Sequence, residues 1–232
     1  MVLTVSNFTV VFWIAVIPAF LSFGLMIFGV EEPARKDDAA PKPRLHWSDT
    51  NRLPAAFWAV VAVATVLTLA RFSEAFLVLR SQNVGLSIAL VPAVMVVMNV
   101  AYALAAYPAG VVSDRLGRNG ILALGIVFLI IADVVLAFGP TIPLMMLGVV
   151  FWGLHMGFTQ GLLATLVADT APAELRGTAF GIFNLATGAV LLVASVLAGW
   201  LWDAVGPTAT FLAGAAFSGC AALLSTARRP PP

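Results

Sequence analysis

Charged residues, cysteine and histidine are all scarce in this sequence. Aspartate, glutamate, lysine and arginine together make up 10% of the 232 residues, whereas hydrophobic residues make up 61%. Soluble domains carry about a quarter charged residues, so a soluble fold could not cover this much apolar surface with so few polar groups. The composition therefore predicts that lipid is the solvent of the chain. A net charge of +1 gives no indication of nucleic-acid binding.

The motifs of several chemistries are also missing. The single cysteine, Cys220, excludes an intrachain disulfide framework, and no cysteine or histidine spacing typical of a metal site is present. The sequence lacks His-Glu-x-x-His, Gly-x-Ser-x-Gly and a phosphate-binding loop ending in Gly-Lys-Ser/Thr. We therefore expect no metal, no cofactor and no catalytic residue, and the sequence does not support direct pumping by ATP.

Long apolar runs dominate what is present. A helix that spans a membrane needs about 20 mostly apolar residues. Seven stretches qualify: 8–29, 55–79, 86–110, 119–138, 141–168, 177–201 and 208–226. Proline and glycine inside them do not argue against helices, because membrane helices tolerate both. The predicted fold is therefore all-α, a polytopic bundle of seven transmembrane helices.

Lysine and arginine are distributed unevenly between the connections. With seven spans, one side of the membrane would hold only Arg80, and Arg71 would lie inside a span. The other side would hold Arg35, Lys36, Lys42, Arg44, Arg52, Arg115, Arg118, Arg176, Arg228 and Arg229. Short loops rich in lysine and arginine face the cytoplasm. We therefore expect a multi-pass protein of the cytoplasmic membrane, with its N-terminus outside and its C-terminus in the cytoplasm.

One charged, proline-rich stretch divides the chain. Residues 31–54 are predicted to form a flexible cytoplasmic linker. A first transmembrane helix in residues 1–30 precedes it. Six closely spaced helices in residues 55–227 follow it, and residues 228–232 form a short cytoplasmic tail.

A string rich in glycine and arginine connects the third and fourth spans. It reads Gly110-Val-Val-Ser-Asp114-Arg115-Leu-Gly117-Arg118-Asn-Gly120. Gly110 and Gly117 permit close approach and unusual backbone angles. Asp114 can accept hydrogen bonds from helix amides or pair with an arginine. The string is expected to turn the chain between two helices, with its arginines at the cytoplasmic headgroups.

The whole string resembles the Gly-x-x-x-Asp-Arg-x-Gly-Arg-Arg/Lys signature of the major facilitator superfamily, although Asn119 replaces the usual second basic residue. In that family the signature lies between the second and third helices of each six-helix half, as it does here. A second stretch resembles the family's loop between the fourth and fifth helices of a half, and it contains Asp169, Pro172, Arg176 and Gly177. The resemblance implies that the chain corresponds to helices six to twelve.

The resemblance also implies a function. The two halves of such a transporter rock about a central site and give a solute alternating access. The chain would then be a secondary transporter for a small-molecule solute, with a proton as a candidate co-substrate, and its loop string would latch onto a helix of the first half. The expected partners are the lipid bilayer and either the missing N-terminal half or a second copy. A truncated, inactive piece of a transporter, and a seven-span receptor or membrane enzyme, are the alternatives.

Polar residues inside the spans are candidates for a substrate or ion cavity. An ionisable residue at mid-membrane costs roughly 2.5–3.5 kcal/mol on insertion scales, so each needs a reason. The spacing of Arg71 and Glu74 predicts a pair on one helical face, and His155 lies deep in the fifth span. A structural ion pair and a hydrogen-bonded structural histidine are the competing interpretations. The full candidate set is Arg71, Glu74, Asn99, Tyr102, Asp133, His155, Thr159 and Asn184.

Glycines recur along the fifth and sixth spans. Gly153, Gly157 and Gly161 are spaced every four residues, and Gly181 and Gly188 share one side of the next span. Small residues at such spacing let neighbouring membrane helices approach closely, so these faces are predicted to pack against other helices. His155, Thr159 and Asp169 fall on the opposite face of the fifth span.

Overall fold

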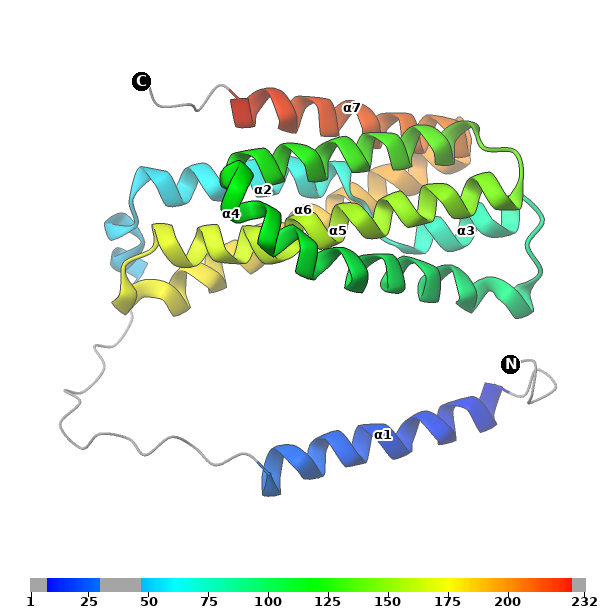
Figure 1. Ribbon diagram of the computed structural model, residues 1–232, viewed down its shortest axis with the longest axis horizontal. Coiled ribbons are helices and arrows are strands. Elements are labelled where there is room, and N and C mark those ends of the chain that lie inside the picture. The colour runs from blue at the N-terminus through cyan, green and yellow to red at the C-terminus, as the bar shows by residue number, and fades with distance from the viewer. Residues whose placement is uncertain (1–7, 30–46, 227–232) are drawn as a thin grey trace. The chain divides into compact units, whose positions relative to one another are not determined.

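The computed structural model of the chain describes residues 8–29 and 47–226, and every regular element within these ranges is helical (Figure 1). The predicted all-α fold is therefore confirmed. The chain divides into two compact units, residues 1–45 and 46–232. The first unit contains α1 (Phe8–Phe28), an apolar helix with Pro18 inside it. Most of the predicted linker and the whole predicted tail lie outside the described residues.

The second unit contains six helices that are long and apolar enough to cross a membrane. They are Ala55–Asn83, Ile88–Ser113, Arg115–Phe138, Ile142–Thr170, Ala173–Ala204 and Pro207–Ser225. Each boundary lies within four residues of the corresponding predicted one. Within α1, the apolar stretch Phe12–Phe28 is shorter than these six. The last part of the predicted linker forms a 3₁₀ helix, η2 (Trp47–Arg52).

The first of the six spans is broken. It consists of α2 (Ala55–Ala70) and α3 (Ala75–Asn83), and four non-helical residues separate them. Arg71 has φ −99° and ψ 73°, which ends α2. Glu74 is the N-cap of α3, and the Oγ of Ser73 just before it accepts a hydrogen bond of 3.3 Å from the Ala75 amide. The 3₁₀ helix η3 (Ile88–Leu90) then leads into α4.

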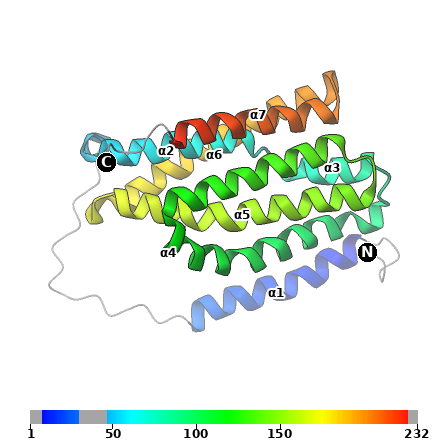
Figure 2. The same cartoon turned by 45° about the horizontal axis from the view of Figure 1, so that its top comes forward.

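The next two spans make up α4 (Val91–Phe138), in which two helices meet at a sharp kink. Only Gly117 departs from helical geometry inside it, with φ 70° and ψ 164°. The bend turns α4 back on itself, so residues 91–116 (the first arm) and 118–138 (the second arm) lie on either side of α5 (Figures 1 and 2). We name the two ends of the bundle after the glycines found there, the Gly117 end and the Gly139 end.

The helix α5 (Ile142–Thr170) runs between the two arms. Gly153 lies against Met98 and Ala101 of the first arm, and Gly148 lies against Leu136 of the second. The 3₁₀ helix η4 (Ala173–Leu175) leads into α6 (Arg176–Ala204), and α7 (Pro207–Thr226) ends the described chain. α7 packs against α2 and α4, whereas α6 packs mainly against α2 and buries little of its surface.

The main core lies between α2, α3, α4, α5 and α7. An aromatic cluster lies around Phe72, in the break between α2 and α3. It occupies the half of this core that is nearer the Gly139 end. The Phe72 ring centroid lies 5.7 Å from that of Trp152 and 5.6 Å from that of Phe211. Trp152 and Phe211 are fully buried. The break is therefore packed on all these sides by large apolar side chains.

Candidate functional site

The Gly117 end of the bundle brings together the two strings that stand apart in the sequence. Arg118, at the start of the second arm of α4, forms an ion pair with Asp169, near the end of α5. The two side chains are 45% and 43% exposed, and exposed ion pairs add little to stability. The pair therefore marks the point at which these two helix ends meet, and it contributes little to the stability of the fold.

The string turns the chain between two helices, as predicted, but the turn is confined to Gly117 and does not extend over the whole string. The helix continues through Gly110 and Arg115, and only Gly117 adopts a positive φ, 70°. Residues with a Cβ rarely adopt this conformation, so one glycine is enough to make the bend. Arg115 is exposed, and the side chain of Asp114 lies outside the described part of the structure.

The second string closes the connection between α5 and α6. The Nε of Arg176 donates a hydrogen bond of 3.1 Å to the carbonyl of Ala168, in the last turn of α5. Pro172 precedes the 3₁₀ helix η4. Gly177 lies in the first turn of α6, where an added Cβ would meet no atom within 4 Å.

Arg71 and Glu74 do not share a helical face, contrary to the prediction. α2 ends at Ala70, and Glu74 immediately precedes α3, so the two residues flank the break. Arg71 lies within electrostatic range of Glu74, Tyr102 and His155. Among the described residues, its guanidinium has no hydrogen bond or ion pair. The break thus presents a cation that its surroundings do not neutralise by direct contact.

His155 is fully buried on α5, at the level of the break. Its Nδ1 lies 2.8 Å from the carbonyl oxygen of Gly125 on the second arm, to which it donates. Its Nε2 has no partner among the described residues, and neither has Nε1 of Trp152, one turn earlier on α5. Thr159 donates to the carbonyl of His155 at 2.8 Å. A buried polar atom without a partner costs about 1–3 kcal/mol, so α5 carries two groups that a bound polar molecule would satisfy.

The other candidate cavity residues are dispersed. Asn99 is exposed and donates to the carbonyl of Met95 at 2.8 Å. Tyr102 is half-buried on the first arm, and Asn184 is exposed on α6. Asp133 is fully buried in the second arm. The structure therefore brings Arg71, Glu74, Tyr102 and His155 together and leaves Asn99 and Asn184 apart from them, whereas Asp133 lies near the carbonyl of Ala70, which directly precedes Arg71.

The glycine faces differ between the two helices. An added Cβ would lie 2.4 Å from the Met98 carbonyl oxygen at Gly153, and 2.6 Å from the Ala105 Cβ at Gly157. At Gly161, Gly181 and Gly188 it would meet nothing within 4 Å. The helix contact predicted for the sixth span is therefore not seen within the second unit, because that side of α6 faces away from its neighbours.

Arg80 is a residue whose role the sequence does not reveal. It is 8% exposed, and its Nε donates to the carbonyl of Leu136 at 2.8 Å. Its second amino group donates to the carbonyl of Gly139 at 3.1 Å, and its first donates to the side chain of Asn83. Arg80 thus caps the C-terminal end of α4, where carbonyl groups lack partners in the helix.

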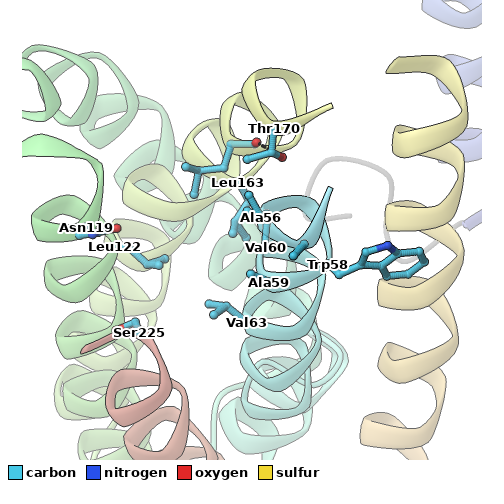
Figure 3. A pocket seen from close by; sticks show the side chains of 12 residues that line it. Ala56, Trp58, Ala59, Val60, Val63, Asn119, Leu122, Leu163, Thr170 and Ser225 are labelled. Carbon is cyan, nitrogen blue, oxygen red and sulfur yellow. Dashed lines mark hydrogen bonds between the residues drawn. The ribbon is translucent and has the colours of Figure 1, made fainter. Parts of the chain in front are cut away.

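A hollow with a volume of about 720 Å³ lies at the Gly117 end. It lies between α2, the second arm of α4, α5 and α7, and Figure 3 shows Asn119 and Leu122 facing Val60 and Val63 across it. Asn119, Thr170 and Ser225 are the polar side chains of its otherwise apolar lining. None of the eight predicted cavity residues lines this hollow.

Comparison with known proteins identifies the family. A sequence model described as Major Facilitator Superfamily matches residues 75–232, which is more than half of the chain. The chain belongs to the major facilitator superfamily. As a member of this superfamily of transporters, it is a multi-pass protein of membranes, and its two strings at the Gly117 end lie where the family resemblance places them.

Curated relatives match between about two fifths and nearly all of this chain. An uncharacterised MFS-type transporter of Methanocaldococcus jannaschii is 27% identical over 224 residues, which are 94% of this chain and 55% of that protein. An uncharacterised protein of Mycobacterium tuberculosis is 30% identical over 166 residues, 71% of this chain and 38% of that protein. A D-xylose transporter of Levilactobacillus brevis is 28% identical over 98 residues, 39% of this chain and 21% of that protein. The chain thus spans about half the length, or less, of these curated relatives.

Proposed function

We propose that this chain forms the second six-helix half, with one preceding helix, of a gradient-driven solute transporter that works by alternating access. The observation that carries the proposal is the Arg118–Asp169 ion pair, which joins the two family strings at one end of the bundle. An exposed charge pair between helix ends can open and close at little cost. It is therefore suited to a latch between two conformations, and relatives named as transporters support the movement of a solute.

The distribution of charge supports an orientation in the cytoplasmic membrane. Arg115, Arg118 and Arg176 all lie at the Gly117 end, and all three are exposed. Among the described residues, Arg80 is the one arginine or lysine at the opposite end, and it is buried. By the positive-inside rule, the Gly117 end faces the cytoplasm. The C-terminus then lies in the cytoplasm, and the N-terminus lies outside.

The solute site that we propose lies at the break between α2 and α3. Arg71 supplies a positive charge there, Trp152 supplies an unpaired donor, and His155 supplies an unpaired Nε2. Transporters commonly place their sites where a helix is interrupted near the middle of the membrane. Arg71 and Trp152 favour a small polar solute with acceptor oxygens, and Nε2 of His155, which accepts when Nδ1 carries the proton, favours a donor such as a hydroxyl group on that solute. The remaining wall of the site would come from the first half or from a second copy of the chain.

Charge reversal tests the latch. Arg118→Asp or Asp169→Arg should lower solute uptake about tenfold, which corresponds to about 1.4 kcal/mol, because each places two like charges together. The double variant should recover most of the uptake. Uptake is measured in proteoliposomes with labelled D-xylose as the first probe, using the chain alone and the chain with the first half of the M. jannaschii relative. Asp203→Asn, at an exposed position on α6, is the matched control. Single variants that transport like the unmodified chain would contradict the latch.

The partner is tested by the mass of the purified chain in mild detergent. A mass of two copies together with uptake supports self-pairing. A monomeric mass, with uptake only after the first half is added, supports a separately supplied partner. Uptake by a strictly monomeric chain would overturn the proposal that the chain acts as a half.

A further inference from the structure

Asp133 stands out among the buried groups of the bundle. It is 0% exposed, and neither of its carboxyl oxygens has a hydrogen-bond partner among the described residues. It lies on the second arm of α4, within a span, where a bare carboxylate is costly. A buried carboxyl group without a hydrogen-bond partner needs either a bound cation or a bound proton.

A free acceptor lies beside it. The carbonyl of Ala70 belongs to the last residue of α2 and would receive the amide of Glu74 if the helix continued. The break removes that donor, and no hydrogen bond to the Ala70 carbonyl occurs among the described residues. Carbonyls at the ends of interrupted membrane helices are known to take part in ion sites. The break thus leaves an acceptor that is ready for a donor.

Gly214 of α7 holds the two groups near one another. A Cβ added to Gly214 would lie 2.8 Å from Oδ2 of Asp133 and 3.1 Å from the carbonyl oxygen of Ala70. Two oxygen acceptors from two different helices therefore lie close to the position that a Cβ at residue 214 would occupy. Only a glycine on the third helix, α7, leaves room for both. Oxygen atoms placed in this way repel one another unless a proton or a cation lies between them.

No fixed charge of the bundle neutralises Asp133. Arg80 of α3 donates to the carbonyls of Leu136 and Gly139, and neither Arg80 nor Arg71 forms a hydrogen bond or ion pair with Asp133. His155 of α5 bonds to Gly125, eight residues before Asp133, which is about 12 Å along the helix axis. α7 contains no charged residue, and Asp203 of α6 is exposed. None of the described residues therefore compensates Asp133 by direct contact, and a proton or cation from outside the protein can do so.

We propose that Asp133 and the Ala70 carbonyl form a proton-binding site at the break between α2 and α3. The carboxyl holds one proton and donates it as an O–H···O hydrogen bond to the Ala70 carbonyl. Two oxygens are too few to replace the hydration shell of a metal cation, which supports the proton as the ligand. The inference rests on the proposed transport function for its biological meaning. It makes Asp133 the site through which a proton enters the transport cycle when the break opens.

Infrared spectroscopy of the purified chain in lipid nanodiscs at neutral pH tests the site directly. The unmodified chain should show the C=O stretching band of a protonated carboxylic acid. This band should be lost in Asp133→Asn and kept in Asp203→Asn. Gly214→Ala should shift the band, because the methyl group separates the carboxyl from the Ala70 carbonyl. This shift also serves as the test if Asp133→Asn fails to fold, which circular dichroism would reveal.

The outcomes separate the site from the transport function. An acid band that Asp133→Asn does not remove, or that Gly214→Ala does not move, overturns the site. A carboxylate band at Asp133 that shifts on addition of NaCl overturns the proton as the ligand. If the band behaves as expected but no uptake is found with any partner, the site stands and the proposed transport function falls.

Discussion

Gly153→Ala is expected to lower the stability of the bundle by about 3 kcal/mol, at the upper end of the cost of overpacking a core. The added methyl group would lie 2.4 Å from the carbonyl oxygen of Met98 and 2.8 Å from the Cβ of Ala101. Neither atom can rotate away, because one is backbone and the other is the first atom of a side chain. α5 and the first arm of α4 would have to separate along their contact. The measurement is unfolding of the purified chain by SDS titration or heat.

Gly161→Ala is the matched control for this substitution. It lies two turns further along the same glycine row of α5, where an added Cβ would meet nothing within 4 Å. Its stability should be unchanged or slightly raised, because alanine favours a helix over glycine by up to about 1 kcal/mol. Equal losses in both variants would mean that the glycines act through the backbone and not through the helix contact.

Arg80→Ala should be the most destabilising substitution of a charged residue at the Gly139 end. It would leave the carbonyls of Leu136 and Gly139 without donors at the buried end of α4. Each unsatisfied buried acceptor costs about 1–3 kcal/mol, so we expect a loss of about 3 kcal/mol. The thermal unfolding midpoint of the purified chain in detergent should fall accordingly.

Two further variants check the reason for this loss. Arg80→Lys should recover only part of the stability, because an ammonium group is a point charge and cannot reproduce the planar fork of donors. Arg115→Ala removes an exposed arginine at the other end and should leave stability unchanged. If Arg80→Lys were as stable as the unmodified chain, positive charge alone would be sufficient and the specific caps would not matter.

The spans could be predicted from sequence because they depend on the length of apolar runs, which the membrane thickness sets. The break at residues 71–74 was not predicted, since no proline or glycine marks it. The one local signal is Ser73, a residue typical of helix starts, whose Oγ accepts from the Ala75 amide. A polar residue within an apolar run does not show whether the helix continues. The spacing of Arg71 and Glu74 therefore predicted a helical pair that the structure does not contain.

The candidate site was predicted only in part, because its partners come from distant helices and are mostly backbone. His155 could be singled out from its position in the span, but its bond to the Gly125 carbonyl depends on how α5 meets the second arm of α4. The glycine rows show where a helix can be approached closely, not which helix approaches. Gly153 and Gly157 have such a neighbour, whereas Gly181 and Gly188 do not within the second unit.

Two of the three hydrogen bonds that Arg80 donates, those to the carbonyls of Leu136 and Gly139, have a mechanical consequence. They fasten α3 to the end of the second arm of α4, while α2 packs mainly against α6 and α7. We therefore expect one span to be divided between two moving bodies, with residues 71–74 as the hinge between them. Distances between spin labels on α3 and the second arm should stay fixed when solute is added, whereas those between α3 and α2 should change. A movement at this hinge would carry Arg71 and the Ala70 carbonyl with α2 and leave Asp133 behind, so that one rotation would alter both the solute site and the proton site.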